Sequence, residues 1–87
     1  MFKPKRKQFK SEAGNEYTFQ TVVPSVWART IDRITDKNGK LLNEFAMQAM
    51  LDNVVAQPQG LKMDDFESWQ ELEEVTQAAF MFQQRGK

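Results

Sequence analysis

The chain has 87 residues, of which 12 are Lys or Arg and 12 are Asp or Glu, so that its formal net charge is zero. This length predicts one domain, residues 1–87, with a thin core that buries only about 60% of the unfolded surface. The sequence contains no Cys and no His. Disulfides are therefore excluded, and the commonest general base, thiolate nucleophile and zinc ligands are missing. We expect a protein that is not an enzyme and that uses no cofactor and no metal.

The charges are unevenly distributed along the chain. Residues 1–40 carry nine basic and four acidic side chains, whereas residues 41–87 carry three basic and eight acidic ones. No apolar run approaches the roughly 20 residues that a membrane span needs, and no apolar stretch follows the basic start as it would in a signal peptide. We therefore expect a soluble cytoplasmic protein that does not bind membranes.

The first 23 residues predict a mobile arm followed by a hairpin. Residues 1–10 are rich in Lys and contain Pro4, a composition that opposes regular structure. Ala13-Gly14-Asn15 is a turn signal between two runs with the alternating pattern of strands. We expect a short β-hairpin over residues 11–23, which must lie against helices because two strands alone are unstable.

Helical spacing begins after this hairpin. Ser25 suits an N-cap, and apolar residues recur at i, i+4 and i+7 from Trp27. Asn38-Gly39 suits the end of a helix, although the same dipeptide also favours a type I′ hairpin turn. The spacing predicts a helix over residues 25–36.

Two further helices are predicted in the second half of the chain. Residues 40–56, beginning with Leu41 and Leu42 after Lys40, are apolar around most of a helical circumference, which is typical of a central helix. Pro58 and Gly60 interrupt the pattern, and acidic residues open a final helix over residues 64–84. The sequence predicts a mainly α fold, a small three-helix domain with a short N-terminal β-hairpin.

The final helix offers apolar side chains that cannot all face one core. Three of them are consecutive, and consecutive residues on a helix point in different directions. Met47 and Met50 likewise point in different directions from the second helix. A small core with ragged edges explains any one of these residues, but together they indicate an adaptable surface for a partner protein. The residues that we expect to bind a partner are Trp69, Phe80, Met81 and Phe82.

The opposite charges at the two ends of the chain suggest self-association. Copies stacked head to tail would place the basic arm of one on the acidic helix of the next, forming a ring or an open spiral. The residues expected at this contact are Lys5, Arg6, Lys7, Glu71, Glu73 and Glu74. The alternatives are a generic interaction module and a small DNA-binding regulator that uses the basic arm. The apolar second helix and the acidic last helix count against DNA, and we expect no nucleic-acid partner.

Two segments carry a resemblance to a known family. "VVAQPQGLKMDDFESWQELEEV" and "YTFQTVVPSVWARTIDRITDKNGKLL" are similar to segments of the tail assembly chaperones of long-tailed bacteriophages and prophages. The similarity covers about residues 17–75. The positions that match the family's connector are Pro58, Gly60, Leu61, Asp64, Asp65, Phe66 and Trp69.

The resemblance implies a mostly helical accessory protein of virion construction. Members of that family coat the tape-measure protein before tail-tube subunits polymerise around it, and they are absent from the mature virion. The implied partners are therefore the tape-measure protein and the tail-tube protein, and the implied location is the cytoplasm of the host bacterium. The strongly basic N-terminal arm departs from what the family leads us to expect.

Overall fold

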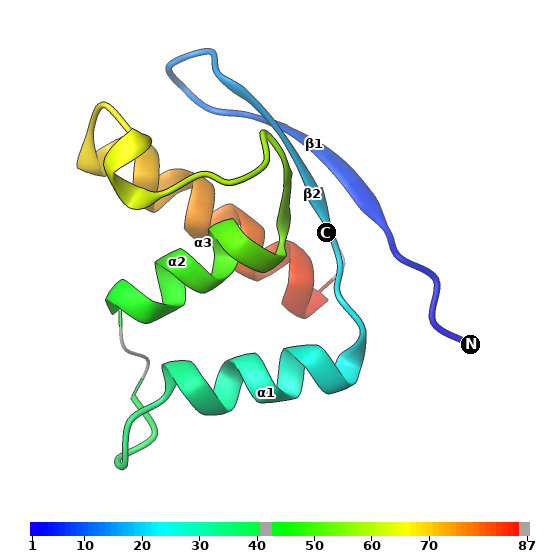
Figure 1. Ribbon diagram of the computed structural model, residues 1–87. Coiled ribbons are helices and arrows are strands. Elements are labelled where there is room, and N and C mark those ends of the chain that lie inside the picture. Colours follow the sequence, from blue (N-terminus) through cyan, green and yellow to red (C-terminus); the bar gives the residue numbers. More distant parts are fainter. Residues whose placement is uncertain (41–42, 86–87) are drawn as a thin grey trace.

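The computed structural model describes residues 1–40 and 43–85, and Figure 1 shows how their helices and strands are arranged. These residues form a three-stranded antiparallel sheet, in the order β1-β2-β3, and three α-helices. Residues 41 and 42, near the start of the helix expected over 40–56, lie outside the described residues. The elements in chain order are β1 (Arg6–Lys10), β2 (Glu16–Gln20), α1 (Pro24–Ile34), α2 (Asn43–Asn53), β3 (Val55–Gln57), the 3-10 turn η1 (Met63–Asp65) and α3 (Trp69–Arg85).

The prediction of a mainly α fold is wrong. Of the described residues, 51% are helical and 17% are in strands, and the sheet has a third strand in addition to the hairpin. The difference lies at the end of the second helix, which was expected to reach residue 56 but ends at Asn53. Val55 instead pairs with Phe19 of β2. Two consecutive β-branched residues followed closely by Pro favour an extended chain over a continued helix.

The hairpin begins earlier than expected, because half of the supposed arm is a strand. β1 pairs with β2 in an antiparallel register that matches Lys7 with Phe19 and Phe9 with Tyr17. The Phe9 ring stacks on the Phe19 ring with centroids 5.3 Å apart. This apolar contact and the backbone pairing hold five residues extended despite their like charges. Gly14, at φ +91°, supplies the left-handed conformation that the turn requires.

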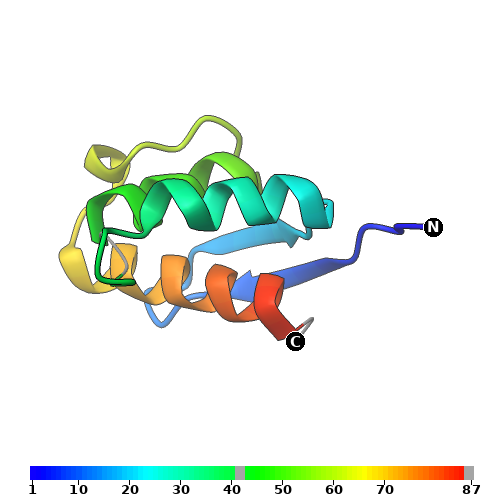
Figure 2. The same ribbon diagram turned by 90° about the horizontal axis from the view of Figure 1, so that it is seen from below.

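α1 begins and ends close to the expected positions. Pro24 occupies its first turn, and Val23, not Ser25, is the N-cap residue. The helix packs along α2, and Figure 2 shows these two helices on one side of the molecule with α3 on the other. At its N-terminal end α1 also reaches α3, since the Trp27 and Phe80 rings lie 5.6 Å apart.

α3 begins five residues later than expected. Ser68 is the capping residue, and its hydroxyl oxygen accepts a hydrogen bond of 3.1 Å from the backbone N–H of Glu71. The acids predicted to cap the helix lie before it, in and after η1. The Asp65 carboxylate accepts a bond of 2.9 Å from the backbone N–H of Lys62, which closes the 3-10 turn. The sequence therefore carried a genuine capping signal, but the element that Asp65 caps is the short 3-10 turn η1 and not α3.

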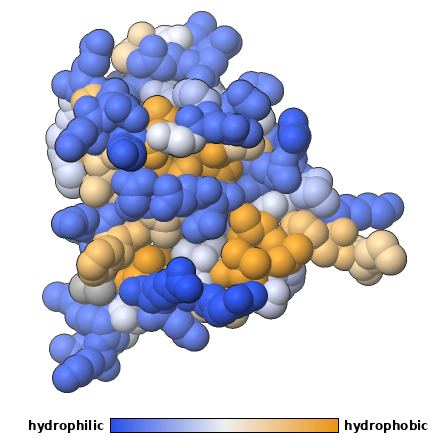
Figure 3. All heavy atoms as spheres, in the orientation of Figure 1, coloured by the Kyte–Doolittle hydropathy of each residue, from blue (hydrophilic) through white to orange (hydrophobic). Residues whose placement is uncertain are grey.

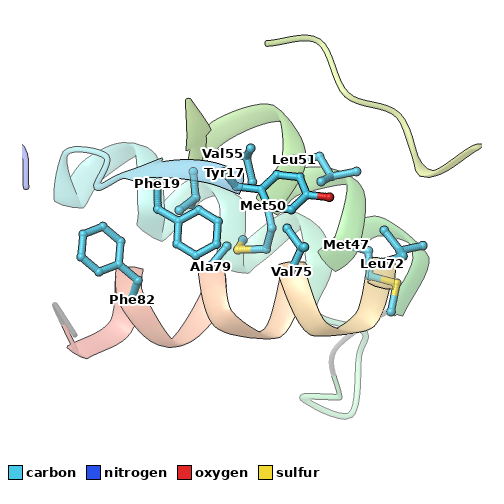
Figure 4. Close-up of a cluster of buried hydrophobic side chains, with 11 residues drawn as sticks. Tyr17, Phe19, Met47, Met50, Leu51, Val55, Leu72, Val75, Ala79 and Phe82 are labelled. Carbon is cyan, nitrogen blue, oxygen red and sulfur yellow. The ribbon is translucent and has the colours of Figure 1, made fainter. Parts of the chain in front are cut away.

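The core lies between the sheet, α2 and α3. Figure 4 shows its side chains converging from β2, from α2 and from the long helix α3. Phe19 is fully buried, and its ring lies 6.2 Å from that of Phe82. The buried residues of the cluster are Tyr17, Phe19, Met47, Met50, Leu51, Val54, Val55, Leu72, Val75, Ala79 and Phe82.

No helix in residues 1–40 and 43–85 has both the length and the apolar character that crossing a membrane requires.

Replacing Phe19 by Ala should lower the free energy of unfolding by about 3–5 kcal/mol, because it leaves a cavity at the centre of the core. Urea denaturation followed by far-UV circular dichroism measures this change. The matched control is Phe45→Ala, since the Phe45 side chain is 59% exposed, and it should cost about 0.5 kcal/mol or less. Equal effects of the two substitutions would contradict the central position of Phe19.

Candidate partner-binding groove

An apolar groove runs between α2 and α3 and is open to solvent. It has a volume of about 330 Å³, which is space for several side chains of a partner rather than for a whole segment. Polar residues at its rim are Asn43, Glu73, Thr76 and Gln77. The apolar residues that line it are Ala46, Met47, Met50, Phe80 and Met81.

Methionine dominates the lining of this groove. Met47, Met50 and Met81 are three of the five Met residues in the sequence. Their unbranched side chains and polarizable sulfur atoms adapt to differently shaped partners. Met47 and Met50 are also core residues, so the floor of the groove is held by the core. Met81, 54% exposed, forms an edge that is free to move.

The structure separates the four side chains that were expected to bind a partner. Phe80 and Met81 line the groove. Phe82 does not belong to the surface, since α3 turns its side chain towards Phe19 and leaves it only 3% exposed. Trp69, which is 59% exposed, stands at the start of α3 and outside the groove lining.

Of the remaining apolar residues of this groove, Met47 and Met50 were expected to contribute to an adaptable surface but were not assigned to the partner site, and Ala46 was not expected there. Met47 and Met50 lie three residues apart on α2, which places them on one helical face. This spacing was a usable signal, but α2 looked apolar almost all round and no single face stood out. Nothing in the sequence indicated that Ala46 lines a groove, because a small side chain leaves a hollow only where larger side chains surround it, and those neighbours are not known from the sequence.

The apolar surface is divided into patches on the face that includes α1. Figure 3 shows orange areas separated by polar residues on this face, without a continuous apolar stripe. Phe45 borders a second hollow, of about 370 Å³ between α1 and α2, together with the charged residues Arg33 and Asp52. The groove between α2 and α3 has the fewer charged residues of the two and is therefore the better candidate for an apolar partner.

Two of the acids expected at a self-association contact bind the chain's own hairpin. The Glu71 carboxylate accepts hydrogen bonds from the Tyr17 hydroxyl, at 2.6 Å, and from the Asn15 amide, at 3.1 Å. The Glu74 carboxylate accepts one of 3.1 Å from the backbone N–H of Glu12. Both carboxylates thus fasten the hairpin turn to α3. Glu73, between them, points to the groove instead.

The hydrogen bonds on Glu71 determine its pKa. Burial alone would raise the pKa of this carboxyl, but the bonds that it accepts from Tyr17, Asn15 and Ser11 outweigh burial and lower its pKa below the ordinary value. Burial, followed by the bond to Glu71, raises the pKa of the Tyr17 hydroxyl. The pair is therefore stable as a neutral phenol that donates to an ionised carboxylate.

The residues of the connector mainly shape the joint between β3 and α3. Phe66 stacks on Tyr17 with ring centroids 6.2 Å apart, and Leu61 packs against the core cluster. Gly60, at φ +72°, adopts a conformation that other residues rarely take. The Pro58 peptide bond is cis, and Asp64 is exposed next to Asp65.

The basic residues expected at the self-association contact lie on or beside the edge strand β1. The backbone N–H of Lys5 donates to the Thr21 hydroxyl, at 2.9 Å. The Arg6 side chain donates to the Gln20 side chain, at 2.8 Å. Lys7 follows in the same strand, and all three residues are exposed. Charged side chains along an edge strand also prevent its pairing with other chains.

Within residues 1–40 and 43–85, no group of three or more acids is arranged to hold a metal ion.

Comparison with known proteins finds no match for this chain among family models, curated proteins or solved structures.

Stability should fall in acid more steeply for the native chain than for Glu71→Gln. Because the pKa of Glu71 is lower in the folded chain than the ordinary 4.5, the unfolded chain binds more protons as the pH falls below about 4.5. The stabilisation is therefore complete above that pH and is lost as the pH falls through the folded pKa. Urea denaturation at a series of pH values measures it.

Tyr17→Phe provides a second variant for this measurement, because it keeps the buried ring and removes the hydroxyl. It should cost about 1.5–3 kcal/mol at neutral pH, the range for hydrogen bonds to charged groups. It should also make the free energy of unfolding fall less steeply as the pH is lowered. If Glu71→Gln and Tyr17→Phe kept the full acid dependence of the native chain, another carboxylate would be responsible.

Proposed function

We propose that this chain is a non-enzymatic tail assembly chaperone of a long-tailed bacteriophage or prophage. It binds apolar-faced helices of the tape-measure protein in the groove between α2 and α3. It does so in the cytoplasm of the host bacterium, before tail-tube subunits polymerise, and it does not remain in the mature virion. The observation that carries the proposal is the solvent-open, Met-lined groove. The resemblance of residues 17–75 to such chaperones supports it.

Covering an apolar helix requires a surface that binds many different side chains moderately well. The flexible thioether side chain of Met81 meets this requirement, because it can repack around each new partner above a floor of Met47 and Met50 that the core holds in place. Burial of apolar surface contributes roughly 25 cal/mol per Å². A groove of this kind binds successive segments of a long client without requiring one sequence.

Self-association is part of the same proposal, because many copies are needed to cover a long client. With Glu71 and Glu74 engaged by the hairpin, the acids that we assign to this contact are Asp64 and Glu67, which are exposed beside the start of α3. The opposing residues are Lys5, Arg6 and Lys7 of the next copy. A contact between different surfaces of identical copies produces a ring or an open spiral.

Met81→Asp should weaken the binding of tape-measure fragments by at least about tenfold, or 1.4 kcal/mol. The substitution places a carboxylate where the partner's apolar side chains would bury it. Fluorescence anisotropy of labelled helical fragments, titrated with the full chain, measures the affinity. Phe45→Asp is the control, because Phe45 is an equally exposed apolar residue of α2 outside this groove.

Absence of binding to any tape-measure fragment would overturn the proposal. Tight, strongly salt-dependent binding to duplex DNA in the same assay would instead favour a small regulator that uses the basic residues of β1. Equal losses in Met81→Asp and Phe45→Asp would move the binding site away from the groove.

Self-association should weaken as ionic strength rises from about 0.1 M to about 1 M, which shortens the Debye length from about 10 Å to about 3 Å. Lys5→Glu should weaken it at low salt, and the double variant Lys5→Glu, Asp64→Lys should restore it by exchanging the two charges. Sedimentation velocity over a range of concentrations measures the mass. Lys37→Glu is the control, because Lys37 is exposed in the turn that follows α1, far along the chain from β1. A strict monomer at every concentration would contradict this contact.

A further inference from the structure

The groove between α2 and α3 has two chemically different ends. Figure 1 shows α2 and α3 both running from the left of the view to the right, so the two helices begin at the same end of the groove. Asn43 and Glu73 lie towards that end, early in their helices. Phe80 and Met81 lie towards the other end. The groove therefore has an acidic end and an apolar end.

Glu73 differs from the acids on either side of it. Glu73 is half-buried, and in the part of the chain that the structure describes its carboxylate takes part in no side-chain hydrogen bond or ion pair. The carboxylates of Glu71 and Glu74 both accept bonds from the hairpin. An apolar partner that covered the groove would remove water from Glu73, at a cost that a cation on the partner would offset.

We propose that the groove selects apolar-faced helices that carry a Lys or Arg near one end, and that it holds them in one orientation. The cation pairs with Glu73, and the apolar side chains lie against Met50, Phe80 and Met81. This inference rests on the proposed function, since it specifies the chemistry of the helical client. Helices with an acid at the same position are disfavoured by repulsion and by the loss of solvent around two like charges.

A second copy of the chain fits this groove less well than a helical client. Five of the 12 Lys and Arg residues of a copy lie on or beside β1, where the one apolar side chain of the strand, Phe9, is stacked on Phe19. Arg29 and Arg33 lie on α1, which packs along α2 of its own copy. β1 therefore offers cations without free apolar side chains. An apolar-faced helix provides both, in the i, i+3 and i+4 spacing that a groove between helices accepts.

Two synthetic helices test the selection by charge. Both have the same Leu-rich face, and they differ in one residue near one end, Lys in the first and Glu in the second. The native chain should bind the Lys peptide about tenfold more tightly by fluorescence anisotropy, a ratio that corresponds to 1.4 kcal/mol. Glu73→Gln should remove most of the difference, and Glu73→Lys should reverse the preference.

Asp32→Lys is the matched control, because it makes the same change of charge at an exposed residue of α1 outside the groove lining and outside the proposed contact between copies. It should leave the ratio between the two peptides close to that of the native chain. Equal shifts in the Asp32→Lys and Glu73→Lys variants would show a general effect of net charge and would overturn the inference.

Orientation is tested by a nitroxide label at one end of the Lys peptide. A label at the basic end should broaden the amide NMR signals of Asn43 and Glu73 more than that of Met81, and a label at the other end should do the reverse. Equal broadening at both ends of the groove would overturn the single orientation.

The failures of the two proposals are distinguishable. If both peptides bind equally, and Met81→Asp weakens the binding of both, the groove is still supported as the binding site and only the selection by charge is wrong. If neither peptide nor any tape-measure fragment binds, the proposed function is wrong and this inference with it. If Glu73→Lys instead abolishes self-association of the chain alone, Glu73 belongs to a contact between copies and the inference is overturned.

Discussion

The packing of one face of β2 against α2 and α3 is the interaction on which this small fold depends. β2 pairs with a strand on each side, and its Phe19 contacts rings from both β1 and α3. A chain of this length has few other side chains that can be fully buried. Met50 lies in this same core and also in the groove. The packing that holds the sheet therefore also fixes the floor of the groove, and only the exposed edge near Met81 can adjust.

Carboxylates fasten the hairpin to α3 in place of ion pairs. Glu71 and Glu74 accept hydrogen bonds from a phenol, an amide and a backbone N–H. Neutral donors of this kind compensate a buried carboxylate because each bond is strengthened by the charge. The acidity of the second half of the chain thus has separate local causes. Asp65 closes a turn, Glu71 and Glu74 hold the hairpin, and Glu73 is left at the groove.

Periodicity and turn residues in the sequence predicted the elements that depend on local interactions. α1 was expected within two residues of its observed ends, because its apolar spacing and Pro24 act locally. The hairpin turn at Gly14 was predicted for the same reason. β3 was missed because Val54 and Val55 continue the apolar pattern of α2, and only pairing with Phe19 makes them extended. The partners of Glu71 were also missed, since Asn15 and Tyr17 lie more than 50 residues away in sequence. The groove required both kinds of information and was only partly predicted, through Phe80 and Met81.

The proposed function requires two properties that oppose each other. It must accept many sequences, and its copies must all point the same way if they are to form regular contacts with one another. A soft apolar lining meets the first need, since buried area supplies most of the affinity at roughly 25 cal/mol per Å² whatever the side chains are. One charge at one end meets the second, because a partly exposed ion pair of about 1 kcal/mol or less changes the affinity little but favours one direction over the other. Several charges in the groove would restrict the range of client sequences that bind. A groove without any charge would not favour one direction of the client over the other. Under the proposed function, one carboxylate among the described lining residues, that of Glu73, beside three methionines is the simplest composition that provides both properties.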